Sequence, residues 1–311
     1  MADLIGLREY PVSTVLKILL QDKTTRKNII FATDAYSDLN TEVKINARTQ
    51  LSPDLILGLN ANVIQPRVYK TLAEQNERTR KKAEVFTPAW ICNKMNNHCD
   101  AEWFGFDNVF NIENGQEWTT TVKAIAFPEG KTWKKYIDSK RLEITCGEAP
   151  YLVSRYDAAT GRPIPIRERI GILDRKLRIV NENTDNEDEW LNWCIRSFQS
   201  VYGYEFQGDN LLIARINLLI TFVDYMEDRW GHRPTDAALR KIANIIVWNL
   251  WQMDGITGTV PYGKPAEAYR QISFFDYEQG RNDTESETID CRIYDWRSNK
   301  SISYRSIKEG K

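Results

Sequence analysis

Residues that build disulfide frames or metal sites are scarce in this chain. Its 311 residues include five cysteines and two histidines, and no two cysteines stand in a Cys-x-x-Cys spacing. Structural zinc sites and disulfide scaffolds both depend on closely spaced sets of such residues. The sequence therefore predicts neither a zinc site nor a disulfide framework.

Long apolar runs and a basic leader are missing as well. The longest apolar stretch, Leu211 to Val223, is interrupted by Arg215 and Asn217 and is too short to cross a bilayer. The first ten residues mix acidic and basic side chains instead of placing basic residues before an apolar run. We therefore expect no membrane segment, no secretory signal and a cytoplasmic protein.

The chain also lacks a surplus of positive charge. The 42 basic and 43 acidic residues give a formal net charge of −1, whereas a protein that grips nucleic acid unaided has a strong positive excess. Any contact with DNA is expected to be local or to be made mostly by a partner. The hydrophobic content of 42% is enough to fill the packed core of one large domain or two modest ones.

Residues 1–83 are expected to form an α-rich N-terminal region. Apolar residues recur at helical spacing from Val12 to Leu19, and a β-like run follows from Lys27 to Ala32. The pattern predicts helices with one small ribbon.

A strongly charged stretch without proline or glycine runs from Arg67 to Lys82 near the end of this region. Its composition favours one helix. We favour the plainer interpretation, a solvated helical face. The sharper interpretation is contact with the DNA backbone, because each neutralised phosphate adds to affinity. The candidate residues for that contact are Arg78, Arg80, Lys81 and Lys82.

Residues 84–311 alternate between strand-like and helical patterns. Pro88 suits a first helical turn and Thr87 can cap it, so a helix is expected there. An irregular or β-like stretch is expected over 107–140, followed by a strand, tight loop and helix start over 141–152. An inserted loop is expected at about 157–199, and after it a strand over 201–206 and a buried helix over 210–226. The last elements expected are a third apolar segment over 241–251 and a hairpin over 291–304.

Acidic residues follow the expected strands at Glu143, Glu205 and Asp254. Strand, acidic residue, loop and helix in repetition is typical of a nucleotide site in a Rossmann-like sheet. The small-residue loop after Glu143 lets backbone N–H groups approach a ligand. Glu205 can accept hydrogen bonds from ribose hydroxyls, and Asp254 can accept one from the exocyclic amine of adenine. The ligand predicted is an adenosyl compound.

Four motifs in order carry a resemblance to a known family. They are Glu84 to Pro88, Leu142 to Leu152, Tyr202 to Glu205 and, more loosely, Met253 to Gly255. Together they resemble the adenine-N6 amino-methyltransferases of bacterial restriction–modification systems, of the Type I and Type IIG kind. The resemblance implies a Rossmann-like sheet that binds S-adenosylmethionine. The cofactor-binding residues it implies are Phe86, Thr87, Pro88, Glu143, Thr145, Cys146, Gly147, Ala149, Glu205, Phe206 and Asp254.

The match departs from the family pattern at three places. Ile144 replaces the usual proline, and Ala149 replaces the second glycine of the loop. Glu143 and Glu205 stand 62 residues apart, whereas a compact βαβ unit separates them by about 20. The stretch at about 157–199, which contains glycine, proline and an acidic run, is the predicted insertion.

Each of these residues also has a plainer explanation. Glu143 fits a solvated strand end, Cys146 a small buried thiol, and Asp254 a turn. Thr87 fits an ordinary helix cap. The ordered context favours a functional role for Glu143, Gly147 and Thr87, whereas the two explanations of Asp254 are evenly balanced.

The family's catalytic motif is absent from the whole chain. Family members hold the flipped adenine amine with an Asn/Asp-Pro-Pro-Tyr/Phe motif, but none of the eleven prolines here is adjacent to another. The nearest imitation, Val260 to Tyr262, is interpreted as a turn.

The resemblance therefore implies the cofactor-binding half of a split enzyme. A partner subunit would carry the catalytic motif, the rest of the sheet and the target-recognition domain, and double-stranded DNA would be bound through the complex. An incomplete sheet further predicts an exposed strand edge and an apolar patch. The alternatives are a catalytically degenerate, methyltransferase-like binding or inhibitory protein and, less favoured, a complete methyltransferase acting on RNA or protein.

Overall fold

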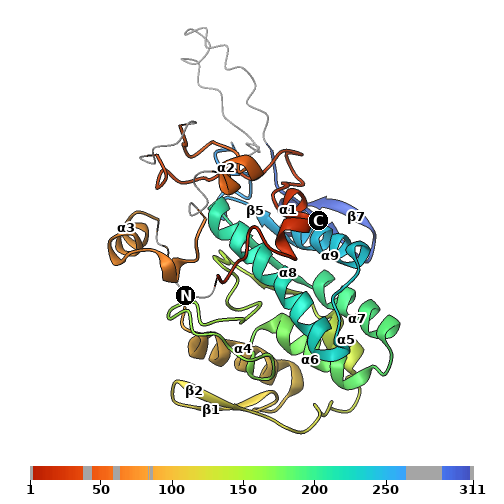
Figure 1. Ribbon diagram of the computed structural model, residues 1–311. Helices are drawn as coiled ribbons and strands as arrows, with labels where there is room; N and C mark the ends of the chain where they lie inside the picture. The colour runs from red at the N-terminus through yellow and green to blue at the C-terminus, as the bar shows by residue number, and fades with distance from the viewer. Residues whose placement is uncertain are drawn as a thin grey trace, which may run out of the picture.

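A small parallel sheet lies at the centre of a mixed α/β fold (Figure 1). The computed structural model describes residues 3–37, 44–58, 64–82, 84, 87–263 and 289–308. The sheet contains β3 (Arg141–Glu143), β4 (Val201–Glu205) and β5 (Leu250–Gln252) in the order β3-β4-β5, and both pairs are parallel. Every residue of the central strand β4 is buried, which is typical of a parallel strand covered on both faces.

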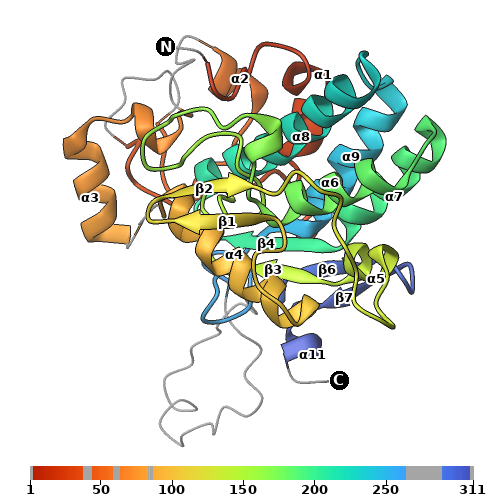
Figure 2. The same ribbon diagram turned by 90° about the horizontal axis from the view of Figure 1, so that it is seen from below.

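Helical crossovers connect the three strands, as parallel pairing requires. The chain leaves β3 through α6 (Ile172–Asn183) and α7 (Glu187–Gln199) before it reaches β4. It then passes through α8 (Gly208–Trp230) and α9 (Asp236–Asn249) to β5. Figure 2 shows these helices on one side of the strands. The predicted strand over 201–206 and buried helix over 210–226 are confirmed, whereas the apolar segment over 241–251 is divided between α9 and β5.

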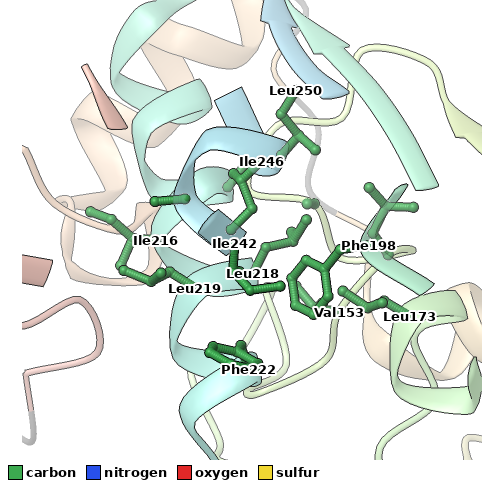
Figure 3. Packing of buried hydrophobic residues seen from close by; sticks show 14 of the residues in the cluster. Val153, Leu173, Phe198, Ile216, Leu218, Leu219, Phe222, Ile242, Ile246 and Leu250 are labelled. Carbon is green, nitrogen blue, oxygen red and sulfur yellow. The ribbon is translucent and has the colours of Figure 1, made fainter. Parts of the chain in front are cut away.

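The main hydrophobic core lies between these helices and the sheet. Figure 3 shows Phe198 of α7, Leu218 and Phe222 of α8 and Ile242 of α9 gathered there. Side chains of α1 (Val12–Leu19) belong to the same core, and α1 contacts both α8 and α9. The core therefore continues across the predicted boundary at residue 83.

The opposite face of the sheet is covered by the C-terminal hairpin. Strands β6 (Arg292–Asp295) and β7 (Lys300–Ser303) pair antiparallel and confirm the predicted hairpin. A second core cluster joins β4 and β5 to this hairpin and to α11 (Tyr304–Lys308). In it the Trp251 ring lies 5.8 Å from the ring of Tyr204 and 5.5 Å from that of Tyr304, between centroids.

The N-terminal region is α-rich, as predicted. Besides α1 it contains α2 (Pro53–Leu57), a 3-10 turn η1 (Arg67–Tyr69) and α3 (Leu72–Lys82). The predicted ribbon is reduced to isolated bridges, Gln21 with Asn28 and Ile30 with Gln50. None of the helices in the described ranges has the length and apolar content needed to span a bilayer.

The stretch before β3 is more regular than its composition indicates. The helix α4 (Ala89–Phe104) begins after Pro88, as predicted, but no side chain caps it, so the cap predicted for Thr87 is wrong. The stretch over 107–140 contains the hairpin of β1 (Asn111–Asn114) and β2 (Glu117–Thr120), which was predicted as β-like, and the short helix α5 (Trp133–Asp138), which was not.

The loop predicted at about 157–199 is wrong over most of its length, because α6 and α7 occupy it. Leu173, Leu177 and Val180 are buried at helical spacing in α6. Three of the acidic residues that suggested a loop, Glu187, Asp188 and Glu189, lie in the first turn of α7, where negative charge complements the helix dipole. The helix start predicted within 141–152 is also wrong, since no helix begins between β3 and η2 (Ile166–Glu168).

Candidate functional site

The carboxyl ends of β3 and β4 bring two buried acidic residues to one edge of the sheet. Glu143 ends β3 and Glu205 ends β4. Because the strands are parallel, these ends lie at the same edge, where α/β sheets bind ligands. The Glu205 carboxylate accepts a hydrogen bond of 2.9 Å from the backbone N–H of Gly147 and so ties the two strand ends together.

The loop after β3 adopts an unusual backbone. Thr145, Gly147 and Ala149 have φ angles of +48°, +53° and +65°, all in the left-handed region. This region suits glycine and strains other residues. Ala149 is fully buried in that conformation, at the position where the family pattern has its second glycine. Thr145 and Ala149 thus adopt backbone conformations that favour glycine.

A neighbouring glycine in β4 makes room for this loop. A Cβ atom at Gly203 would lie 3.2 Å from the Cys146 sulfur, closer than such contacts normally are. The backbone N–H of Cys146 donates to the carbonyl of Tyr204 at 2.8 Å and extends the ladder into the loop. Cys146 is buried, so its thiol also serves as packing, as the plainer explanation holds.

A pocket of about 350 Å³ opens beside this loop. Its volume falls within the roughly 300–1,000 Å³ that is typical of small-molecule sites. Five of the eleven predicted cofactor residues line it, namely Thr87, Glu143, Thr145, Cys146 and Gly147. Residues from Thr87 and from the loop after β3, far apart in the sequence, therefore share one cavity.

The other predicted cofactor residues do not line this pocket. Ala149 and Glu205 are buried behind its loop. The Phe206 ring lies 5.6 Å from the Tyr262 ring, and Pro88 begins α4. Asp254 accepts hydrogen bonds from the next backbone N–H groups, of Ile256 at 2.9 Å and Thr257 at 3.3 Å, which is a turn. Phe86 lies outside the described residues.

The two carboxyl groups are held by backbone amides alone. Glu143 accepts from the N–H groups of Tyr151 at 3.3 Å and Leu152 at 3.1 Å. Burial raises the pKa of Glu143 to about 8, although these two hydrogen bonds act in the opposite direction.

Glu205 accepts from three backbone N–H groups, those of Gly147, Phe206 and Gln207. Its pKa is also raised by burial, against these hydrogen bonds. No described lysine or arginine forms an ion pair with Glu143 or Glu205.

The helix α4 supplies pocket residues that sequence reasoning missed. Met95, Asn96 and Cys99 line the pocket together with Tyr151. The Asn96 side chain donates to the carbonyls of Tyr151 and Ile170, both at 3.0 Å, and so anchors the loop to α4. The available signal was the spacing of Asn96 and Cys99, which places them on one side of the helix after Pro88.

A second cluster of charge joins α3 to the start of α8. Arg78 is buried and pairs with Glu84 at 2.6 Å and with Asp209 at 2.8 Å. The Tyr36 hydroxyl donates to the same Asp209 oxygen at 2.5 Å. The prediction that Arg78 contacts DNA phosphates is therefore wrong, because its guanidinium is enclosed by carboxylates. Arg80 is exposed and stays a prediction, and the side chains of Lys81 and Lys82 lie outside the described structure.

Comparisons with known proteins found no counterpart for this fold or site. No protein-family model, no curated protein and no solved structure matches the chain. Metal chemistry has no support in the part of the chain that is described, where no three histidine, cysteine or acidic side chains are grouped to hold an ion.

Proposed function

We propose that this chain is the S-adenosylmethionine-binding subunit of a split DNA adenine-N6 methyltransferase. One observation carries the proposal. The loop from Thr145 to Gly147 and the carboxyl group of Glu143 border one pocket at the carboxyl edge of parallel strands, with Glu205 tied to the loop at 2.9 Å. The strand order β3-β4-β5 suits one half of a Rossmann-like sheet.

The charge state of the pocket suits a cationic ligand. Glu143 has no cationic partner within the described residues, and its raised pKa shows that its ionised form lacks compensation there. S-adenosylmethionine carries a positive sulfonium and a positive ammonium group, and it supplies an electrophilic methyl group when bound. A positive group beside Glu143 would favour the carboxylate, and the ionised carboxylate would favour the ligand in return.

Glu205 has limited capacity left for the predicted ribose contact. Its carboxylate has about four acceptor sites, and backbone N–H groups already occupy three. We assign Glu205 mainly to holding the Gly147 loop, with room for one further hydrogen bond. The backbone N–H groups of Cys146 and Gly147 already donate within the protein, so we assign the contact with the positive end of the ligand to the Glu143 carboxylate.

The free edge of β3 supports the partner required by a split enzyme. Arg141 donates its N–H to Ser200 at 2.9 Å, so the backbone groups of Leu142 face away from β4. No strand in the described ranges pairs with that edge. Leu142, Ile144 and Met95 line the pocket and are 43%, 64% and 53% exposed, and we assign to them the apolar patch that an incomplete sheet would expose.

Calorimetric titration of the full chain with S-adenosylmethionine tests the proposal. We expect saturable binding that weakens at least tenfold in Glu143→Gln, because the amide keeps the shape but cannot become negative. Glu129→Gln, in an exposed turn, is the matched control and should bind as the wild type does. Thermal melts of all three proteins exclude misfolding. Absence of binding both to the chain and to its purified complex would refute the proposal.

The same titration distinguishes the proposed cofactor-binding subunit from the second candidate function, a catalytically degenerate binding or inhibitory protein. The three backbone N–H groups that already occupy Glu205 and the turn formed by Asp254 favour that candidate. It predicts no cofactor binding under any condition. A methyl-transfer assay on the chain alone tests the third candidate, a complete methyltransferase, since turnover without a partner would identify a complete enzyme.

A further inference from the structure

A second pocket, larger than the cofactor pocket, is lined mostly by basic and polar side chains. Its volume is about 940 Å³, and it shares no lining residue with the first. The cations that line it are Lys17, Lys23, Arg26, Lys27 and Arg292, and Asp22 is the only acidic residue among its described lining residues. This concentration of positive charge contrasts with the nearly neutral balance of the whole chain.

Asp22 forms no ion pair with any of these cations among the described residues. It is 5% exposed, and its oxygens accept hydrogen bonds from the N–H groups of Thr24 and Thr25, both at 3.1 Å, and from the Thr25 hydroxyl at 2.6 Å. The carboxylate therefore shapes the turn that carries the cations. Among the described residues, no acidic side chain lies within ion-pair distance of Lys17, Arg26 or Lys27.

Tertiary structure assembles the pocket from segments far apart in the sequence. The turn from Lys23 to Lys27 lies between the bridged residues Gln21 and Asn28. Arg292 of β6 donates its N–H to the Thr24 hydroxyl at 3.0 Å and so joins the hairpin to this turn. The helix α9 contacts both α1 and β6, and Figure 1 shows α1, α9 and β7 close together.

Two side chains in the pocket are already oriented for a ligand. The Arg292 guanidinium donates to the hydroxyl and carbonyl oxygens of Ser301 at 2.8 and 2.7 Å, which fixes its direction, and no acidic side chain in the described ranges lies within ion-pair distance of it. The Lys23 ammonium lies 5.9 Å from the centre of the half-buried Trp248 ring. Burial and the nearby Arg215 lower the pKa of Lys23, so an anion at this position would relieve crowded positive charge.

We propose that this pocket binds a phosphodiester segment of nucleic acid, with Lys17, Lys23 and Lys27 at the phosphates. Cations spread over a pocket of this size suit several phosphates in a row better than one small anion. Trp248 adds a ring on which an unpaired base can stack. The inference rests on the proposed function only for taking the nucleic acid to be DNA, and it provides the local contact that Arg78 does not.

Fluorescence anisotropy with labelled DNA tests this inference. The full chain, without cofactor, is titrated with a labelled single strand and with the corresponding duplex over a series of salt concentrations. We expect the logarithm of the binding constant to fall linearly with the logarithm of the salt concentration. The double variant Lys23→Gln/Lys27→Gln should bind at least about tenfold more weakly at low salt. Its salt slope should be smaller by about 1.8 for the duplex and about 1.4 for the single strand, since each lost phosphate contact removes about 0.9 and about 0.7, respectively.

The control carries the same loss of charge outside the pocket. Arg240→Gln/Lys241→Gln removes two exposed cations from α9 that do not line it and should bind as the wild type does. Trp248→Ala separates the two DNA forms, because lost stacking weakens the single strand and spares the duplex.

Three outcomes would overturn the inference. They are no salt-dependent binding to either DNA, equal losses in pocket and control variants, and binding of inorganic phosphate without binding of DNA. Glu143→Gln lies in the other pocket and should leave DNA binding intact, so failure of the cofactor proposal is distinguishable from failure of this one.

Discussion

Asp209 and Glu143 are both buried near the carboxyl edge of the sheet, yet their charges are balanced in opposite ways. Asp209 lies within 2.8 Å of Arg78 and 3.4 Å of Lys70. Burial alone would raise the pKa of Asp209, but these two cations outweigh it and lower the pKa to about 2. Glu143 has only backbone N–H partners, and burial raises its pKa to about 8.

The difference separates a structural cluster from a candidate site. Around Asp209 the negative charge is balanced by Arg78 and Lys70 inside the protein, so the cluster fastens α3 to α8. Around Glu143 the negative charge lacks a counter-ion within the described structure and borders an open pocket. Burial of an acidic residue therefore does not identify a site by itself, whereas burial without a compensating charge beside a cavity makes the residue a candidate for one.

Removing Arg78 should have the largest effect on stability. Arg78→Met leaves Asp209 and Glu84 buried without their main cation, and breaking such a pair costs about 3–5 kcal/mol. Chemical denaturation of the variant measures the loss. Arg80→Met, at an exposed position of the same helix, should change stability by less than about 0.5 kcal/mol.

Equal effects of the two substitutions would show that the cluster around Asp209 is not structural. If Arg78→Met does not fold, Tyr36→Phe offers a milder test. It removes one hydrogen bond to Asp209, and a hydrogen bond to a charged group contributes about 1.5–3 kcal/mol.

Glu143→Gln should change how stability depends on pH. The pKa of Glu143 is about 8 in the folded protein against 4.5 for the free side chain. Between these values the folded state binds more protons than the unfolded state, so the free energy of unfolding falls as pH rises, by up to about 1.4 kcal/mol per pH unit.

The glutamine variant lacks this titrating group, so its stability relative to the wild type should increase as pH rises from 4.5 to about 8. Denaturation curves at several pH values measure the difference between the two proteins. A difference that stays constant with pH would contradict the assignment of Glu143 as an uncompensated carboxyl group.

The smallest effect is expected at Ala149, in the loop that Glu205 holds. Its φ of +65° favours glycine, so Ala149→Gly should raise the free energy of unfolding by up to about 1 kcal/mol. Ala214→Gly, at a buried position within α8, is the control and should lower it by about 1 kcal/mol or more. Thermal melts of both variants suffice, and destabilisation by both would contradict strain in this loop.

The strands and several site residues could be predicted from the sequence because their signals are local. The apolar run before Glu205 predicts β4, and Gly147, four residues after Glu143, predicts a tight loop. Thr87, Glu143 and Gly147 line one pocket, as their motifs indicate. The helices α6 and α7 were missed because their polar and acidic residues resemble those of a loop, although the same acidic residues stabilise the start of α7.

The residues that were misassigned from the sequence have partners that come from distant parts of the chain. Nothing near Arg78 in the sequence indicates that Asp209, 131 positions later, will enclose its guanidinium. The basic pocket was missed for the same reason, since Arg292 joins the turn at Lys23 only in the folded chain. Asp254 was balanced between two explanations, and its hydrogen bonds to Ile256 and Thr257 form a turn.

By itself the sequence determined the local elements and the order of the motifs, because apolar periodicity and turn residues act over a few positions of the chain. Only the tertiary structure decided which charged groups are neutralised and which are left without a partner, because a pKa depends on burial and on charges brought close from distant segments. Asp209 and Glu143 are both acidic residues near the end of a strand, and folding alone gives one its cations and leaves the other beside a pocket.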